Sequence, residues 1–348
     1  MRDQGLGSGD WVSALQSNLQ HLTSNFKLNE PLSRYTTSRL GGPADALIEA
    51  VSADELQAVV VAARRVEVPI LILGGGANVL VSDAGVRGLT IINKAKRIEF
   101  RADNVVWCEA GTVLPTLARE CIAHGLSGLE WAVGVPGTVG GAVVGNAGAH
   151  GRDTAADLVS ATILSAANEV VEWSNADLQF EYRSSRIKRD AGSKRQDAGS
   201  KKQEAEGRMQ EAGNKRQDAA NTEHAPRTTK HAVLAATFRL TPGDPIELEK
   251  KAAEYNDYRR RTQPPGASLG SMFKNPPGTA AGRLTDECGL KGTRIGGVEI
   301  STVHANFFVN HGNATAADVK ALIDLAQATV RGRFGIELEL EIELVGEW

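Results

Sequence analysis

The segment Pro69–Asp83, PILILGGGANVLVSD, joins a continuous apolar run to three successive glycines and then to a second apolar run. A short apolar run is typical of a buried strand, and the glycines predict a tight turn where that strand ends. The turn has two interpretations. Without side chains at Gly74, Gly75 and Gly76, backbone N–H groups can approach a phosphate closely, but a purely structural turn fits the sequence equally well.

The residues before this segment complete an α/β unit. Ser52-Ala-Asp-Glu55 has the capping-box pattern that opens a helix, and the apolar residues after it recur at helical spacing. Strand, helix, strand and glycine turn in this order predict a unit that holds a ligand at a strand end. The turn is neither a dinucleotide fingerprint nor a P-loop, because it lacks the G-x-G-x-x-G spacing and a following Gly-Lys-Ser/Thr.

A second glycine-rich segment spans residues 128–151, GLEWAVGVPGTVGGAVVGNAGAHG. Each glycine costs a regular helix about 1 kcal/mol relative to alanine, so this density predicts backbone that lies flat against a bulky ligand. Tryptophan and valine residues alternate with the glycines, which a merely flexible loop would not require. The segment is therefore predicted to line a ligand site.

The composition limits the class of protein. Hydrophobic residues make up 41% of the 348 residues and charged residues 23%, as in soluble globular proteins. A net charge of −3 and an aromatic content of 5% argue against a nucleic-acid partner. Three cysteines without a CxxC pair predict neither a disulfide framework nor a metal site. With no leader-like apolar region and no apolar run of about 18 residues, a cytoplasmic protein without membrane contact is expected.

Three further segments shape the expected organisation. Residues 1–20 are expected to be flexible, and the Pro/Gly cluster at residues 241–245 predicts a domain boundary. Residues 191–218 repeat a seven-residue unit such as AGSKRQD, with Met209 as the single large apolar side chain. Without an apolar seam, the repeat is predicted to be a disordered insert that extends to about residue 230.

The C-terminal third contains the polar groups that are candidates for chemistry. In SLGSMFKNP, residues 268–276, Gly270 permits a sharp turn and Pro276 ends any regular element. Ser271 would then lie on a short, stiff loop, although a surface turn is an equally good interpretation. The segment IELELEIELVG, residues 336–346, alternates like a final strand with four glutamates on one face. That face is normally solvated, but burial of one glutamate would raise its pKa and make it a usable acid.

Arg183 follows an aromatic residue in the segment LQFEYRSSRIK. A guanidinium is the natural bidentate partner of a substrate carboxylate, although a solvated strand residue is also compatible with this position.

Taken in order, eight motifs resemble the UDP-N-acetylenolpyruvoylglucosamine reductase family. They are YTTSRLGGPAD, LGGGANVLV, GVPGTVGGAVVGNAGAHG, YRSS, GSMFKNP, GLKGTRIGG, VHANFFVN and FGIELELEIELVG. The resemblance runs from about residue 29 to residue 346 and is interrupted only by the repeat. The resemblance implies an α+β fold with a two-part FAD-binding region of the vanillyl-alcohol-oxidase (PCMH) type, followed by an α+β substrate-binding domain. The expected parts are residues 21–97, residues 98–243 with the insert at 191–230, and residues 244–348.

The resemblance also implies an activity. The chain would be a flavoenzyme that binds FAD non-covalently and takes hydride from NADPH. It would reduce the enolpyruvyl group of UDP-N-acetylglucosamine enolpyruvate to a lactyl ether, giving UDP-N-acetylmuramate for peptidoglycan synthesis. Its partner would be this small nucleotide-sugar, with no nucleic acid, membrane or metal, and it would act as a monomer.

Motif by motif, the resemblance places the family's three catalytic positions at Arg183, Ser271 and Glu341. By the same resemblance, Asn275 corresponds to a substrate-binding position, and Lys274 suits either substrate binding or assistance to Ser271 in proton transfer. The implied cofactor-binding residues are Gly74, Gly75, Gly76, Ala77, Asn78, Val79, Leu80, Gly134, Pro136, Gly137, Thr138, Gly141, Asn146, Gly148 and Ala149.

Two departures from the family pattern remain. No separate folded insert that would cover the substrate lies between the YRSS and AVLAATFRL segments, which resembles the compact type II branch, and Ala77 stands where a serine is common. Two other functions use the same scaffold: an oxygen-using flavin oxidase, and a non-catalytic protein that senses flavin or nucleotide. The oxidase would not need Arg183, Ser271 and Glu341 together.

Overall fold

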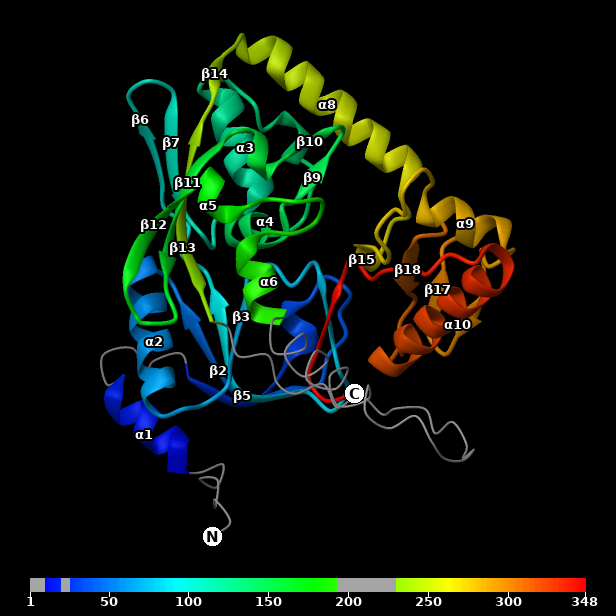
Figure 1. Ribbon diagram of the computed structural model, residues 1–348, viewed down its shortest axis with the longest axis horizontal. Coiled ribbons are helices and arrows are strands. Elements are labelled where there is room, and N and C mark those ends of the chain that lie inside the picture. Colours follow the sequence, from blue (N-terminus) through cyan, green and yellow to red (C-terminus); the bar gives the residue numbers. More distant parts are fainter. Residues whose placement is uncertain (1–9, 20–25, 193–229) are drawn as a thin grey trace, which may run out of the picture.

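The computed structural model describes residues 10–19, 26–192 and 230–348, and in Figure 1 these form two lobes, a long connecting helix and a C-terminal domain. Nearly all of the seven-residue repeat lies outside the described residues. The fold is α+β, as predicted.

The first lobe is a four-stranded sheet in the order β1-β2-β5-β3. Strands β2, β5 and β3 run parallel, and β1 is antiparallel to β2. Ser52 caps the helix that crosses from β2 to β3, because its side chain accepts a hydrogen bond of 3.2 Å from the N–H of Glu55. Only this half of the capping-box pattern forms, because the Glu55 carboxylate accepts from the Val51 N–H instead of the Ser52 N–H, but the helix confirms the predicted α/β unit. The elements are α1 (Asp10–Asn18), β1 (Lys27–Pro31), the 3₁₀ turn η2 (Leu32–Tyr35), β2 (Pro43–Ala50), α2 (Ala53–Arg65), β3 (Ile70–Leu73), β4 (Val79–Val81) and β5 (Val86–Asn93).

The N-terminal segment is more ordered than its composition predicts. Residues 10–18 form α1 instead of fraying, and Trp11, Leu15 and Leu19 are buried against α2 and the first sheet. These three apolar residues recur at intervals of four, so they lie on one helix face. The prediction of a flexible segment over residues 1–20 is wrong for this part, because the helix buries an apolar face.

The second lobe is an antiparallel five-stranded sheet in the order β12-β11-β13-β7-β6, with helices packed on it. Two short two-stranded sheets, β9 with β10 and β8 with β14, lie outside this sheet. The strands of the lobe are β6 (Ile98–Arg101), β7 (Val105–Glu109), β8 (Leu126–Ser127), β9 (Gly148–Ala149), β10 (Arg152–Asp153), β11 (Leu158–Leu164), β12 (Val170–Ser174), β13 (Ala232–Arg239) and β14 (Thr241–Pro242). Its helices and 3₁₀ turns are α3 (Leu114–Ala123), η3 (Glu130–Ala132), α4 (Val139–Gly145), η4 (Thr154–Ala156), α5 (Asn175–Leu178) and α6 (Arg186–Gly192).

Part of the glycine-rich segment is helical, contrary to the expectation that it lies flat throughout. Helix α4 contains three glycines, and for one of them, Gly140, packing accounts for the absence of a side chain. A Cβ on Gly140 would lie 3.0 Å from the Cβ of Ala110, and the Gly140 N–H donates to the Ala110 carbonyl at 2.7 Å. The close approach of α4 to the end of β7 therefore favours a residue without a side chain at this position.

Helix α8 (Pro245–Thr262) connects the second lobe to the C-terminal domain and is the long yellow helix in Figure 1. Its buried residues Leu248 and Ala252 belong to the apolar core of the second lobe. The helix therefore packs as part of that lobe, although its first residue lies at the boundary predicted from residues 241–245.

The C-terminal domain packs two helices on an antiparallel sheet of order β15-β18-β17-β16. Thr315 forms a capping box with Asp318, and Gly335 ends the long helix in the left-handed conformation with φ of 68°. The elements are β15 (Ala267–Ser271), α9 (Ala281–Glu287), β16 (Arg294–Ile295), β17 (Val298–Ile300), β18 (Phe307–Asn310) and α10 (Ala316–Phe334).

The chain then returns to the first lobe through β19 (Glu343–Val345), which pairs in parallel with β4. The final strand predicted over residues 336–346 is therefore reduced to these three residues. Residues 336–342 have no regular partner strand. Their one β-type pairing is the isolated bridge between Leu340 and Phe273. The four glutamates consequently do not share one face: Glu337 and Glu339 are exposed, whereas Glu341 is largely buried.

Polar contacts attach the C-terminal domain to the first lobe. The hydroxyl of Thr37 donates to the carbonyl of Ser268 at 2.8 Å. The carboxylate of Asp83 accepts from the first two N–H groups of α10, those of Ala316 and Ala317, at 2.8 and 2.9 Å. These contacts fix the position of β15, which carries Ser271, relative to the glycine turn after β3.

Candidate active site

Two glycine segments meet at the carboxyl end of β3. A Cβ on Gly75 would lie 3.1 Å from the Cα of Gly137, and a Cβ on Gly74 would lie 2.1 Å from the hydroxyl oxygen of Thr138. Such contacts are possible only because residues 74 and 75 carry no side chain. The segments that the sequence identified separately therefore form one cradle, which we call the glycine cradle, residues 74–78 and 134–138.

The cradle is held by backbone hydrogen bonds and retains unused polar capacity. The N–H of Leu114 donates to the Gly137 carbonyl at 3.0 Å, and the N–H of Val139 donates to the Thr112 carbonyl at 2.9 Å. The hydroxyl of Thr112 is buried and has no partner among the described residues. A buried hydroxyl without a partner is costly unless a ligand or a water molecule satisfies it. Backbone exposed at a glycine cradle beside such a hydroxyl fits a phosphate-bearing cofactor such as FAD.

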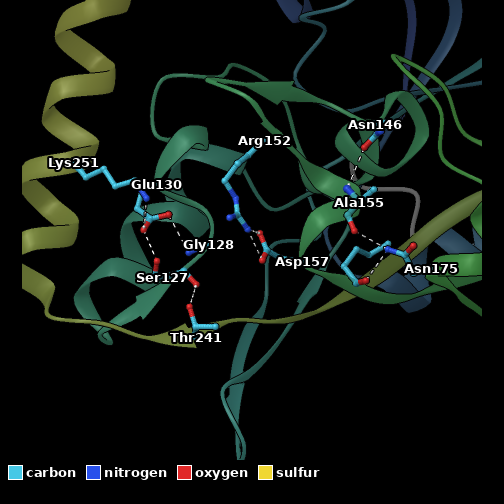
Figure 2. Close-up of polar contacts among 11 residues, drawn as sticks. Ser127, Gly128, Glu130, Asn146, Arg152, Ala155, Asp157, Asn175, Thr241 and Lys251 are labelled. Atoms are coloured by element: carbon cyan, nitrogen blue, oxygen red, sulfur yellow. Dashed lines mark hydrogen bonds and ion pairs between the residues drawn. The ribbon is translucent and has the colours of Figure 1, made fainter.

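Two of the predicted cofactor residues have side chains that face elsewhere. Leu80 is fully buried in the core of the C-terminal domain. The side-chain amide of Asn146 donates to the Asp153 carboxylate and the Glu181 carbonyl, both at 3.1 Å. It also accepts from the Ala155 N–H at 3.1 Å (Figure 2). These internal bonds stabilise its left-handed backbone at the end of α4. Leu80 and Asn146 therefore leave only backbone atoms for a cofactor.

The other predicted cofactor residues lie in or next to the glycine cradle, or on the β9 turn. Gly75, Asn78, Pro136 and Gly141 are exposed, and Thr138 is buried. The partly buried positions are Gly74, Ala77, Val79, Gly134, Gly137, Gly148 and Ala149, and Gly76 is buried.

Arg183 and Glu341, far apart in sequence, form an ion pair. Arg183 Nε lies 2.7 Å from Glu341 Oε1, and the two side chains are 24% and 15% exposed. A second nitrogen of Arg183 donates to the Gly148 carbonyl at 3.0 Å, which joins the pair to the β9 turn. Burial raises the pKa of Glu341 above its ordinary value, and the positive charge of Arg183 opposes this rise most strongly. The glutamate that sequence alternation could not single out is thus the buried one.

A backbone hydrogen bond connects the segment of Ser271 to that of Glu341. Gly270 adopts φ of 76°, which favours glycine, at an irregularity in the pairing of β15 with β18. The carbonyl of the next residue, Met272, accepts a hydrogen bond of 2.9 Å from the N–H of Glu341. The structure therefore brings the segments of all three predicted catalytic residues together.

The two predicted substrate-binding residues already have protein partners. Lys274 Nζ lies 3.2 Å from Glu339 Oε2, on the same segment as Glu341. The side-chain carbonyl of Asn275 accepts from the first N–H of α9, that of Ala281, at 3.1 Å. This bond leaves the NH2 group of Asn275 for the predicted contact with substrate.

Sequence reasoning missed two basic residues next to the cradle. Burial lowers the pKa of Arg259 on α8, and among the described residues no carboxylate lies within ion-pair distance of it. A Cβ on Gly134 would lie 2.8 Å from the Arg259 side chain. His150 stacks on Tyr255 at 4.2 Å between ring centroids, and its Nε2 is buried without a partner in the described chain. The missed signal was the triplet Arg259–Arg261, in which one arginine faces inward.

A buried carboxylate ties α8 to the start of the glycine-rich segment (Figure 2). Glu130 is 1% exposed, accepts from the Ser127 hydroxyl at 2.6 Å and the Gly128 N–H at 3.0 Å, and lies 3.5 Å from Lys251 Nζ. Burial acts to raise the pKa of Glu130, but hydrogen bonds from Ser127 and backbone N–H groups and the charge of Lys251 outweigh it, so the pKa is lowered.

Glu130→Gln is expected to lower the free energy of unfolding by about 1–3 kcal/mol at neutral pH, because buried donors lose their charged acceptor. Since folding lowers the pKa of Glu130 below 4.5, its contribution is present above that value and is lost as pH falls through the folded-state pKa. Urea unfolding from neutral pH down into the acid range below the folded-state pKa measures both effects. Glu247→Gln is the control, because Glu247 is an exposed carboxylate on α8, the helix that carries Lys251. Equal losses in the two variants would contradict the assignment.

Among the described residues, none of the helices has the length and apolar character needed to traverse a bilayer. Within the same ranges, no group of three or more His, Cys, Asp or Glu side chains is arranged to hold a metal ion.

Comparison with known proteins identifies the family. Residues 44–174 match the model of an FAD binding domain, and residues 262–345 match that of the C-terminal domain of UDP-N-acetylenolpyruvoylglucosamine reductase. The reductase of Rubrobacter xylanophilus is 42% identical over 94% of this chain and 98% of its own length. That of Chloroflexus aggregans is 39% identical over 94% and 99%.

A solved structure supports the same family assignment. The crystal structure of the reductase from Thermus caldophilus superposes with a TM-score of 0.69, at 33% identity, over 92% of this chain and 98% of that one. The likeness covers both lobes and the C-terminal domain, so it is not confined to the cofactor-binding region. The chain belongs to the UDP-N-acetylenolpyruvoylglucosamine reductase family.

Proposed function

We propose that this chain reduces the enolpyruvyl group of UDP-N-acetylglucosamine enolpyruvate to the lactyl ether, with FAD as cofactor and NADPH as hydride donor. The observation that carries the proposal is the buried Arg183–Glu341 pair, 2.7 Å apart, with the Ser271 segment hydrogen-bonded to it. The product, UDP-N-acetylmuramate, serves peptidoglycan synthesis.

The glycine cradle and the Thr112 hydroxyl would hold FAD. When bound and reduced, FAD supplies hydride to the terminal carbon of the substrate double bond. Backbone N–H groups of residues 74–78 and 134–138 would bind its diphosphate, where the missing side chains permit close approach. Arg259 would add positive charge at the Gly134 end of the cradle, whereas burial and the charge of Arg259 lower the pKa of His150, so this side chain would act as a neutral imidazole.

Arg183 and Glu341 would stabilise the charge that develops on the substrate. Addition of hydride at the terminal carbon leaves negative charge delocalised into the substrate carboxylate. The Arg183 guanidinium would attract that charge, and Glu341 in its acid form would donate a hydrogen bond to it. A carboxyl with a raised pKa retains its proton to higher pH, which suits Glu341 to this role.

Ser271 would complete the reaction by donating a proton to the carbon next to the carboxylate. Hydride at one carbon and a proton at the other give the saturated lactyl group with no atom left over. The rigid position of Ser271 follows from Gly270 and from the pairing of β15 with β18. Lys274 and Asn275, on the same loop, would bind the nucleotide-sugar.

We further propose a division of labour along the chain. The first lobe (residues 21–97) and the second lobe (residues 98–243, with the insert at 191–230) would bind FAD, and residues 244–348 would bind substrate. The packing of Leu248 and Ala252 in the second lobe supports moving the functional boundary to the end of α8, near Thr262. We propose a cytoplasmic monomer, since its substrate is a soluble nucleotide-sugar.

Arg259→Met is expected to weaken nucleotide binding about ten- to a hundredfold, because a charge-assisted hydrogen bond contributes about 1.5–3 kcal/mol. Quenching of flavin fluorescence on apoprotein measures FAD affinity, and calorimetry with UDP on the FAD-loaded protein measures affinity for the substrate nucleotide. Arg260→Met is the matched control, since the side chain of Arg260, next to Arg259 in the sequence, is 76% exposed and pairs with Asp257. Wild-type affinity for both ligands in Arg259→Met would contradict a role in nucleotide binding.

The proposed function is tested with purified protein. It should be yellow with stoichiometric FAD, and it should oxidise NADPH beyond the single equivalent that reduces its FAD only when the enolpyruvyl nucleotide-sugar is added. NADPH oxidation that needs oxygen and ignores the substrate would indicate a flavin oxidase. Colourless protein that does not take up FAD would contradict any flavoenzyme function.

A further inference from the structure

A lysine–carboxylate pair lies directly beside the Arg183–Glu341 pair. Lys188, on α6, places its Nζ 3.3 Å from Glu343 Oε1, and the two side chains are 19% and 24% exposed. The same Nζ donates to the backbone carbonyl of Arg183 at 3.4 Å. Lys188 therefore connects three elements: the turn that carries Arg183, helix α6, and β19 immediately after Glu341.

The backbone of Arg183 needs such support. Arg183 has φ of 57°, in the left-handed region that residues with a Cβ rarely adopt. The two hydrogen bonds between Glu181 and Ser184, at 3.0 and 3.1 Å, close the turn around it. The bond from Lys188 adds a contact on the Arg183 carbonyl itself, so it resists relaxation of the turn to an ordinary conformation.

β19 positions Glu341 from the other side. The Asn78 side chain donates to the Glu341 carbonyl at 3.2 Å, and the N–H of Glu343 donates to the Asn78 carbonyl at 2.9 Å. Glu343 is thus bound to the glycine cradle by its backbone and to Lys188 by its side chain. A shift of Lys188 would be transmitted to both members of the Arg183–Glu341 pair.

Three cationic groups face Glu341. They are Arg183 from its turn, Lys188 from α6, and Lys274 from the loop after β15. Burial raises the pKa of Glu341, and these three charges oppose the rise in that order. Removal of the Lys188 charge should therefore raise the pKa of Glu341 further.

We propose that Lys188, paired with Glu343, is a positioning residue that holds the turn of Arg183 in place and keeps a positive charge close to Glu341. The inference rests on the proposed function, in which Arg183 and Glu341 act on the substrate. Lys188 itself need not touch the substrate, because its effect passes through the Arg183 carbonyl and through β19.

Kinetics of Lys188→Met, Lys188→Arg and Glu343→Gln test the proposal. Lys188→Met should lower kcat about ten- to a hundredfold, because a small misplacement of catalytic groups has an effect of this size. If the acid form of Glu341 is required, the rate falls as pH rises through its pKa, so this alkaline limb should move to higher pH in Lys188→Met. Lys188→Arg should restore the limb to its wild-type position. Glu343→Gln should lower kcat without raising the limb, because it keeps the Lys188 charge.

A second measurement does not depend on turnover. Carbon-13 NMR titration of protein with labelled glutamate carboxyls, with Glu341→Gln to assign the signal, gives the pKa of Glu341 directly. Lys188→Met should raise that pKa and Lys188→Arg should not. Inactive wild-type protein would contradict the proposed function, yet the titration would still decide whether Lys188 acts on Glu341.

Unchanged kcat together with an unchanged Glu341 pKa in Lys188→Met would overturn the proposal. If that variant does not fold, Glu343→Gln decides, because it breaks the same ion pair by a nearly isosteric change. Wild-type kcat in folded, FAD-loaded Glu343→Gln would equally overturn a positioning role for the pair.

Discussion

Ser271→Ala is expected to reduce FAD with NADPH at the wild-type rate and then to transfer hydride to the substrate about 10²–10⁴-fold more slowly, the usual effect of losing a general acid. The reason is that the substitution removes only the proposed proton donor. Gly270 and the pairing of β15 with β18 still fix the backbone. Anaerobic stopped-flow absorbance of the flavin, with each half-reaction started separately, measures both rates.

Ser268→Ala is the matched control for this variant. Ser268 lies three residues earlier on the same strand, and its backbone carbonyl, not its side chain, receives the hydrogen bond from Thr37. Both half-reactions should therefore remain at the wild-type rate in Ser268→Ala. If Ser271→Ala also retained both rates, Ser271 would not be the acid.

Glu341→Gln is expected to slow the substrate half-reaction about 10²–10³-fold, in the range seen when one group that stabilises developing charge is removed. Glutamine still donates hydrogen bonds, but its amide is a much weaker acid than a carboxylic acid and therefore a weaker donor to the developing negative charge. Reduction of FAD by NADPH should remain unchanged. The rate of the substrate half-reaction across the pH range measures the loss.

The pH dependence of the substrate half-reaction gives a second test of the role of Glu341. Burial raises the pKa of Glu341, so the acid form persists above the ordinary pKa of a glutamate and the wild-type rate should fall only as pH rises through the raised value. Glu341→Gln should lose this alkaline limb. Glu337→Gln, on an exposed side chain of the same segment, should retain both the limb and the rate. A limb that persists in Glu341→Gln would assign it to another group.

Local sequence patterns predicted the elements whose causes are local. Ser52 accepts the capping bond from the Glu55 N–H that its position predicts, and α2 follows it as expected. The three catalytic candidates were located through family resemblance, and the structure brings their segments together. Spacing within the sequence could not do this, because the repeat and most of the C-terminal domain separate Arg183 from Glu341.

Expectations failed where a distant partner decides the local structure. Alternation over residues 336–346 predicts one strand, but pairing starts only at Glu343, where β4 supplies a partner strand. Gly140 appears too costly for a helix until its contact with Ala110 is known. Arg259 is one of three successive arginines, and only the fold distinguishes the buried one from its solvated neighbour Arg260.

The central claim is that residues of the second lobe and of the C-terminal domain act together on the enolpyruvyl group while the glycine cradle holds FAD. It is tested most directly by mixing NADPH-reduced protein with the enolpyruvyl nucleotide-sugar in the absence of oxygen. The account predicts that the yellow absorbance returns and that an equivalent amount of the lactyl ether forms. Absorbance that returns only when oxygen is admitted, with no lactyl ether formed, would contradict it.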